Sequence, residues 1–304
     1  MNALVIGYGS IGKRHSRLLE ELNCTVSIVS RREVDFPNRY ASIREAFKET
    51  RPDYVVVANR TNEHTETLSE LAQLKFEGRV LVEKPLSDEP VVFPGGLTEE
   101  TFVAYNFRFH PLLHDLRDRL EEEEIISVDG YAGEYLPDWR PERDYRESYS
   151  AHRDQGGGVL RDLSHELDYL NWILGGWNRV SALGGQFSKL EISSDDVFIL
   201  LLETERCSAV TVHLNYLDRG PHRSLRVNSA DHTFEVDFIE ETISVDGECI
   251  ADYDLGRDAT YRAEHEAVLD RDYGKLCTFR EGQEVVELID AAEKSASNQT
   301  WVSK

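Results

Sequence analysis

The sequence has few of the features that build secreted domains or bind nucleic acids. Its four cysteines show no C-x-x-C spacing, which argues against a disulfide framework or a zinc site. Lys and Arg number 34 against 57 Asp and Glu, and the resulting net charge of −23 disfavours nucleic acid and anionic membranes as partners. No apolar run is long enough to cross a bilayer, and the first strand begins at residue 3, which leaves no room for a signal peptide. We expect a cytoplasmic protein without a metal.

Glycine gathers at one informative place, directly after the first apolar strand. Residues 3–6 lead into a G-x-G-x-x-G turn, and an amphipathic helix follows. Gly7 permits the tight turn, Gly9 lets a pyrophosphate approach the backbone, and Gly12 lets helix and strand pack closely. The amide groups at the helix start, around Ser10 and Ile11, then face the phosphates. This pattern predicts a dinucleotide site.

The end of the second strand, residues 24–29, predicts which dinucleotide binds. An NAD site usually places an acidic residue here to accept from the ribose 2′-hydroxyl. This chain instead has Ser30, Arg31 and Arg32, which can donate to or clamp a 2′-phosphate. NADP is therefore the expected cofactor, with NAD as the alternative.

Two domains are expected from the length and from a change in the pattern of elements. Residues 1–110 alternate strands with helices, which indicates an α/β Rossmann domain with a parallel sheet. Residues 111–304 carry six strands at hairpin spacing and then two helices, which indicates an α+β domain with a large, open, mostly antiparallel sheet. Residues 198–202 are apolar at every position, so both faces of that strand should be covered, one of them by a second subunit.

Polar residues follow three strands of the first domain. Asn59 and Thr61 follow the strand at 54–58, Glu83 and Lys84 follow the strand at 80–82, and Arg108 follows the strand at 102–105. Because ligands of open α/β sheets bind outside the carboxyl ends of the strands, these side chains should face the cofactor together.

A second candidate group lies on a helix that opens after three glycines, Gly156-Gly157-Gly158. Asp162, His165 and Tyr169 follow at i, i+3 and i+7, so on one continuous helix they would share a face. A histidine oriented by a neighbour suits general acid–base catalysis, and the glycines would let backbone and ligand approach closely.

The ordered set of these motifs resembles the glucose-fructose oxidoreductase, inositol dehydrogenase and rhizopine-catabolism (Gfo/Idh/MocA) family. The resemblance covers nearly the whole chain, and it implies a sugar or polyol substrate and a sheet used to form a homodimer or homotetramer. It also implies that Lys84 sits beside the nicotinamide and the reacting hydroxyl, and that His165 transfers the proton. Many members carry Asp four residues before this histidine, whereas here position 161 is Arg and Asp162 is the candidate partner. His64 also matches a family position, but we interpret it as structural.

The segment before the three glycines is rich in aromatic and charged residues. Aromatic faces suit the C–H surfaces of sugars, and arginines suit an acidic or phosphorylated group. The expected substrate residues are Arg108, Trp139, Arg140, Tyr149 and Tyr169.

We therefore predict hydride transfer between NADP(H) and a secondary hydroxyl or ketone of a sugar, sugar acid or sugar nucleotide. One alternative is a non-catalytic NADP-binding regulator, against which the presence of both Lys84 and His165 argues. The other is an NAD-dependent glycosidase, which the Arg31–Arg32 pair disfavours.

Overall fold

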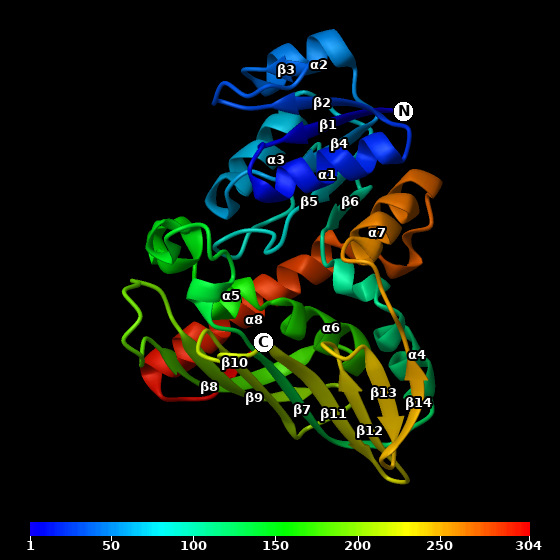
Figure 1. The fold of residues 1–304 in the computed structure, drawn as a ribbon, viewed down its shortest axis with the longest axis vertical. Helices are drawn as coiled ribbons and strands as arrows, with labels where there is room; N and C mark the ends of the chain where they lie inside the picture. Colours follow the sequence, from blue (N-terminus) through cyan, green and yellow to red (C-terminus); the bar gives the residue numbers. More distant parts are fainter. The chain divides into compact units, whose positions relative to one another are not determined.

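The computed structural model describes all residues 1–304, which form two compact units (Figure 1). The first unit contains residues 1–109 and 257–283, and the second contains residues 110–256 and 284–304. Residues 257–283, which the sequence pattern placed in the C-terminal domain, thus return to the first unit. They do so because Ala267, Val268 and Leu276 pack into the core of its sheet.

The first unit is a Rossmann-like α/β fold. Its seven-stranded sheet has the order β15-β6-β5-β4-β1-β2-β3, and all neighbours are parallel except β15 with β6. The strands are β1 Asn2–Ile6, β2 Thr25–Val29, β3 Arg39–Tyr40, β4 Tyr54–Val57, β5 Arg79–Val82, β6 Thr101–Val103 and β15 Cys277–Thr278. The helices are α1 Ser10–Glu21, α2 Ile43–Thr50, α3 His64–Gln73 and α7 Ala259–Asp270.

Local sequence explains the centre of this sheet. β4 and β5 are buried at every position, as expected for parallel strands covered on both faces. The parallel register aligns Ile6 with Val29 and Val57, and Val57 with Val82, so these strands end at one edge. No helix forms between β5 and β6, where Asp88–Thr98 is a loop.

The second unit is built on a nine-stranded, mostly antiparallel sheet. Its order is β14-β13-β12-β11-β7-β10-β9-β8-β16, and β7 with β10 is its parallel pair. The strands are β7 Ile125–Gly133, β8 Trp177–Gly185, β9 Val197–Thr204, β10 Val210–Asn215, β11 His222–Ser229, β12 Thr233–Asp237, β13 Thr242–Val245, β14 Glu248–Asp252 and β16 Val302–Ser303. The helices are α4 Pro111–Arg119, α5 Val159–Asp162, α6 His165–Leu174 and the greater part of α8 Phe279–Asn298.

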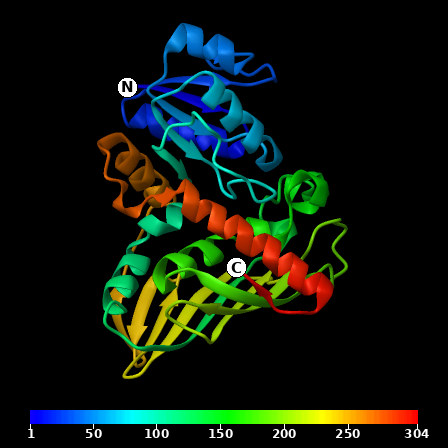
Figure 2. The ribbon, with the colours of Figure 1, turned by 180° about the vertical axis from the view of Figure 1, so that it is seen from behind.

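The two faces of this sheet differ. One face is covered by α8, which lies along β8 (Figure 2). There Trp177 Nε1 donates to Glu284 O and Ala182 N donates to Ser295 Oγ. On β9, Leu200 and Leu202 are buried, whereas Ile199 and Leu201 are 37% and 48% exposed. The strand therefore alternates between a packed face and an apolar face that this chain leaves open.

Candidate cofactor and catalytic site

The carboxyl edge of the first sheet brings the predicted cofactor residues together. The aligned register puts Gly7, Ser30 and Asn59 just beyond β1, β2 and β4, and Glu83 just beyond β5. Gly7 N donates to Val29 O, and Glu83 N donates to Val57 O, so backbone hydrogen bonds continue past the strands. The edge is a single surface made from separate polar strand ends.

The three motif glycines have different surroundings. Gly7 has φ +98°, and a Cβ there would meet the Ala58 and Asn59 backbone. A Cβ on Gly12 would collide with the carbonyl oxygen of Gly7. A Cβ on Gly9 would meet nothing within 4 Å, and Gly9 is exposed at the N-cap of α1 with no side-chain cap. Gly7 and Gly12 thus serve the fold, while the space over Gly9 and the free first-turn amides suit an anionic ligand.

The end of β2 has no carboxylate at the first position after the strand. Ser30 is buried, and its Oγ donates to Arg32 O while accepting from Arg32 N, which fixes a local turn. Arg31 is 80% exposed and pairs with Glu63 at 3.1 Å. Because an exposed ion pair contributes about 0–1 kcal/mol, a phosphate can replace Glu63 at little cost.

These residues fit a dinucleotide. Besides the uncapped α1, Asn59 offers a buried Oδ1 that has no hydrogen-bond partner, although its Nδ2 donates to Thr67 Oγ1 at 2.9 Å. Thr61 begins a short 3-10 helix, Thr61–Glu63, at the same strand end. An unsatisfied buried acceptor is costly unless a ligand or water completes it.

Lys84 is half-buried just past β5, and its surroundings fix its backbone. Its N–H donates to Glu83 Oε2 at 3.2 Å, and the peptide to Pro85 is cis. The following turn is held by His64, whose Nδ1 lies 3.2 Å from both Pro85 O and Leu86 O and so carries the proton that they share. Burial lowers the pKa of His64, so this histidine is neutral. Its position is that of a structural group.

In the second unit, the predicted continuous helix is divided. α5 ends at Asp162 and α6 begins at His165, with Leu163 and Ser164 between them. The prediction that Asp162, His165 and Tyr169 share one face of a single helix is therefore wrong, because Asp162 lies on α5 and the other two lie on α6. Tyr169 is fully buried with its ring 5.7 Å from Phe238, and its hydroxyl has no partner. Most residues of α6 are buried, on more than one face of the helix. They include Glu166, which is fully buried and pairs with Arg223 at 2.7 Å.

Asp162 is a buried carboxylate that two tyrosine hydroxyls hold in place. Tyr149 donates to its Oδ1 at 2.6 Å, and Tyr216 donates to its Oδ2 at 2.5 Å. Burial and the Asp162 charge raise the pKa of both tyrosines well above the ordinary value, so both remain donors. The structure brings the predicted Tyr149 to Asp162 and adds Tyr216, which was not predicted from the sequence. Tyr216 sits just past β10, 54 residues from Asp162, so local spacing gives no signal for it.

The three glycines before α5 make room for the protein's own atoms. A Cβ on Gly157 would collide with the carbonyl oxygen of Tyr149, and one on Gly158 would collide with the Asp195 carboxylate. Asp195 also accepts from Leu160 N at 3.0 Å, and its burial raises its pKa to about 6. Close approach of a ligand is thus not what requires these glycines.

The remaining substrate candidates divide between the units. Trp139 is half-buried with its ring at 90° to Tyr216 and 5.2 Å away, and Arg140 is exposed nearby in the chain. Arg108, in the first unit, is 2% exposed and pairs with Glu281 at 2.8 Å. Burial raises the pKa of Glu281, but Arg108 and hydrogen bonds from Thr278 leave it below its ordinary value. Arg108 is thus a buried side chain whose partner in the ion pair, Glu281, is 37% exposed.

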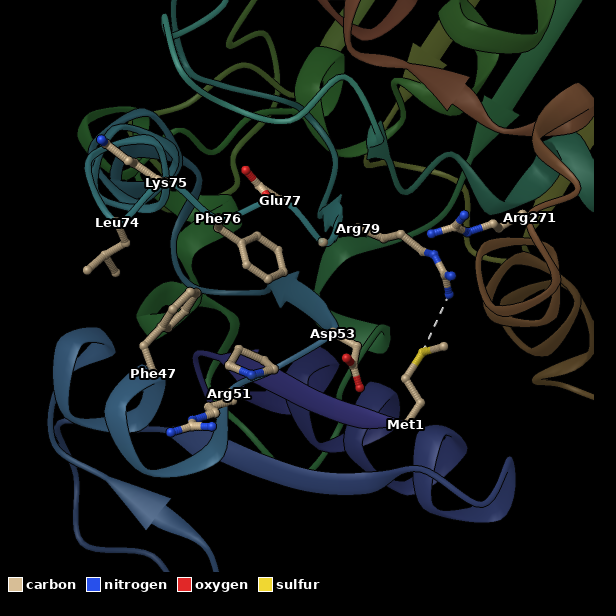
Figure 3. Close-up of a pocket in the computed structure, with 12 residues that line it drawn as sticks. Met1, Phe47, Arg51, Asp53, Leu74, Lys75, Phe76, Glu77, Arg79 and Arg271 are labelled. Atoms are coloured by element: carbon tan, nitrogen blue, oxygen red, sulfur yellow. Dashed lines mark hydrogen bonds between the residues drawn. The ribbon is translucent and has the colours of Figure 1, made fainter.

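A cavity of about 780 Å³ lies at the opposite edge of the first sheet and contains none of the predicted site residues (Figure 3). Met1, Asp53 and Gly78 line it, and each precedes a strand, so it marks the amino edge. Arg79 points into it from β5 and donates to Met1 Sδ.

The fold and the carboxyl-edge site define a dinucleotide-binding oxidoreductase with a separate sheet-based unit. Comparison with known proteins agrees. Residues 1–91 match the family model described as "Oxidoreductase family, NAD-binding Rossmann fold", and residues 113–244 match that of the "GFO/IDH/MocA C-terminal domain". The chain belongs to the GFO/IDH/MocA family of oxidoreductases.

Individual relatives are distant in sequence. Levoglucosan dehydrogenase of Pseudarthrobacter phenanthrenivorans is 23% identical over 210 residues, which cover 60% of this chain and 53% of that protein. A structure of levoglucosan dehydrogenase with NADH has a TM-score of 0.83 at 16% identity over 100% of this chain and 98% of the other. The WlbA dehydrogenase of Bordetella pertussis, solved with NADH and UDP-GlcNAcA, has a TM-score of 0.81 at 17% identity, over 100% and 97%. These structures share the fold of this chain. No helix of this chain is both long and apolar enough to span a membrane.

Proposed function

We propose that this oxidoreductase transfers a hydride between NADP(H) and a secondary hydroxyl or ketone of a sugar, sugar acid or sugar nucleotide. The observation that carries the proposal is the exposed, uncapped start of α1 beside a β2 end that has arginines where NAD sites have a carboxylate. The relatives support a sugar as the substrate class, since one is a levoglucosan dehydrogenase and another was solved with UDP-GlcNAcA. Their complexes contain NADH, so the preference for NADP rests on this chain's own residues.

The cofactor would be held by two parts of the carboxyl edge. The amides following Gly9 would bind the pyrophosphate, while Arg31 and Arg32, on the turn that Ser30 holds, would bind the 2′-phosphate. Asn59, with its unpaired Oδ1, would accept from a ribose or amide group. When bound, the nicotinamide supplies the site that accepts or gives the hydride.

Side chains of the protein would accept the hydroxyl proton of the substrate and stabilise the negative charge that develops on its oxygen. Oxidation of a secondary alcohol requires its hydroxyl proton to leave, so a base must lie within hydrogen-bond reach. We assign the base to His165 and assign to Lys84 the orientation of the hydroxyl and the stabilisation of its developing negative charge. Asp162, held by two tyrosine hydroxyls, is the fixed negative charge that we assign to orienting and stabilising the protonated histidine.

The test is a turnover screen with the unmutated protein. Neutral sugars, sugar acids and nucleotide sugars are each mixed with NADP⁺ or NADPH, and the absorbance of the reduced nicotinamide is followed. We expect turnover with at least one class, and faster turnover with NADP(H) than with NAD(H). Tight NADPH binding without turnover on any class would favour a non-catalytic regulator, and products formed without net reduction would favour a glycosidase.

A further inference from the structure

A buried chain of four polar side chains crosses the first unit beneath the cofactor edge. Tyr54 OH lies 2.9 Å from His265 Nδ1, His265 Nε2 lies 2.8 Å from His15 Nδ1, and His15 Nε2 lies 2.7 Å from Glu83 Oε1. The residues come from β4, α7, α1 and the end of β5, and all four are buried, with both histidines at 0% exposure. The mechanism above uses none of the first three.

The donors and acceptors limit the direction of these hydrogen bonds. A carboxylate only accepts, so His15 must carry a proton on Nε2 and donate to Glu83. Burial and the neighbouring His15 lower the pKa of His265 well below the ordinary value, so His265 is neutral and has one N–H. Burial likewise keeps Tyr54 protonated by raising its pKa. In the direction that is tested below, each ring has one proton and each group donates toward Glu83: Tyr54 to His265, His265 to His15, and His15 to the carboxylate.

The chain ends next to the proposed reaction centre. Glu83 receives His15 on Oε1, and its Oε2 accepts the backbone N–H of Lys84. The Tyr261 ring packs edge-on against His15 at 5.9 Å and closes the chain from the side of α7. Hydrogen bonds aligned in one direction polarise one another and restrict the carboxylate to one orientation.

The geometry points to His15 as a positioning residue, which, backed by His265 and Tyr54, fixes Glu83 and through it the backbone that presents Lys84. This inference rests on the proposed function only for the role of Lys84. His15 lies three residues beyond Gly12 on α1, so the helix that offers its amides to the cofactor also holds the Lys84 turn. His265 belongs to residues 257–283, so the segment that returns to this unit also supplies the buried partner of the His15 imidazole.

The direction of the hydrogen bonds from Tyr54 to Glu83 is tested in the unmutated protein by nuclear magnetic resonance of ¹⁵N-labelled histidines. Both His15 and His265 should be Nε2–H tautomers, with imidazole protons shifted downfield by strong hydrogen bonds. A proton on Nδ1 of either residue, in a neutral or a doubly protonated ring, would overturn the proposed direction, whatever the protein's activity.

Positioning is tested with a matched pair of variants, His15→Gln and His15→Asn. The Gln amide extends to where Nε2 lies and can still donate to Glu83, whereas the shorter Asn amide stays near the position of Nδ1. We expect His15→Asn to lower kcat by about tenfold to a hundredfold, the usual effect of a small displacement in a reacting group. His15→Gln should recover most of that loss. NADPH affinity, measured by fluorescence titration, should stay within a few fold of the unmutated protein in both.

Equal kcat values for the Gln and Asn variants would show that His15 acts only through packing and would overturn the proposal. A parallel Lys84→Ala variant separates this outcome from failure of the proposed function. If Lys84→Ala turns over normally, the role of Lys84 is wrong. If Lys84→Ala is impaired while His15→Asn is not, the positioning role of His15 is wrong.

Discussion

At the scale of single residues, the site depends on charges and hydrogen bonds that side chains hold in place. Arg31 is exposed and paired only with Glu63, so it is available to a phosphate, whereas Ser30 is committed to the local turn at Arg32. Asp162 is held from both sides by phenol groups. These side chains differ in whether they are available to a ligand or already held by hydrogen bonds within the protein.

The arginines should set the cofactor preference. NADPH should bind the unmutated chain at least about tenfold tighter than NADH, since about 1.4 kcal/mol suffices for that ratio. In the double variant Arg31→Ala, Arg32→Ala, this preference should disappear through loss of NADPH affinity. Calorimetric titration with NADPH and with NADH measures this preference. The control is Arg39→Ala, which removes an arginine that donates to the Arg32 carbonyl, and it should keep the preference for NADPH. Equal affinities in the unmutated protein would refute the NADP assignment.

Asp162 should act through its charge rather than as the proton acceptor. Asp162→Asn places an amide donor against a tyrosine hydroxyl that already donates, so one of the two hydrogen bonds is lost. We expect a smaller loss of kcat than in His165→Ala and little change in NADPH affinity. Tyr216→Phe, which leaves one carboxylate oxygen without its donor, should resemble the Asn variant. A loss in Asp162→Asn larger than in His165→Ala would make Asp162 the base.

At the scale of elements, the sequence predicted those whose signals are local. The apolar strands β1, β4 and β5 and the glycine turn before α1 are confirmed because each is encoded within a few consecutive residues. The break between α5 and α6 was not predicted, since neither Leu163 nor Ser164 is a helix-breaking residue type. His265 and Tyr216 were missed because their partners lie 250 and 54 residues away, which no periodicity records.

Two glycines at the start of α1 should respond in opposite ways to the same small substitution. Gly9→Ala adds a methyl group into open space at φ −80°, so the free energy of unfolding should fall by no more than about 1 kcal/mol, the cost of Ala at an N-cap, while NADPH affinity falls. Gly12→Ala forces the methyl group into the Gly7 carbonyl and should destabilise the fold by about 1–3 kcal/mol. Thermal melting without cofactor, paired with NADPH titration, separates the two. Unchanged NADPH affinity in Gly9→Ala would place the pyrophosphate elsewhere.

At the scale of the whole molecule, the sheet of the second unit has an apolar surface that one chain leaves open. Leu183, Ile199 and Leu201 are 61%, 37% and 48% exposed on neighbouring strands β8 and β9. Exposed apolar patches of this kind mark interaction surfaces. We propose that a second copy covers them in a homodimer or homotetramer.

Light scattering at micromolar concentration should therefore show an oligomer for the unmutated chain. The double variant Ile199→Lys, Leu201→Lys should shift it to the monomer while leaving its helix content intact. Glu121→Gln, at an exposed position after α4 that lies outside the sheet, also makes the net charge less negative and should remain oligomeric. A monomer in the unmutated protein would contradict this assignment of the sheet face.

The most direct test of the account is single-turnover hydride transfer in the Lys84→Ala and His165→Ala variants, using a substrate found in the turnover screen. Each variant is loaded with saturating cofactor, and the nicotinamide absorbance is followed after mixing. Each rate should fall by about 10²–10⁴, the usual contribution of positioned acid–base groups. The losses should be less than additive in the double variant, because residues that act as one unit fail together. NADPH affinity should stay within a few fold, because the phosphates would be bound at Gly9 and Ser10. An unchanged hydride-transfer rate in either single variant would contradict the proposed chemistry, and for His165→Ala it would move the base to another residue.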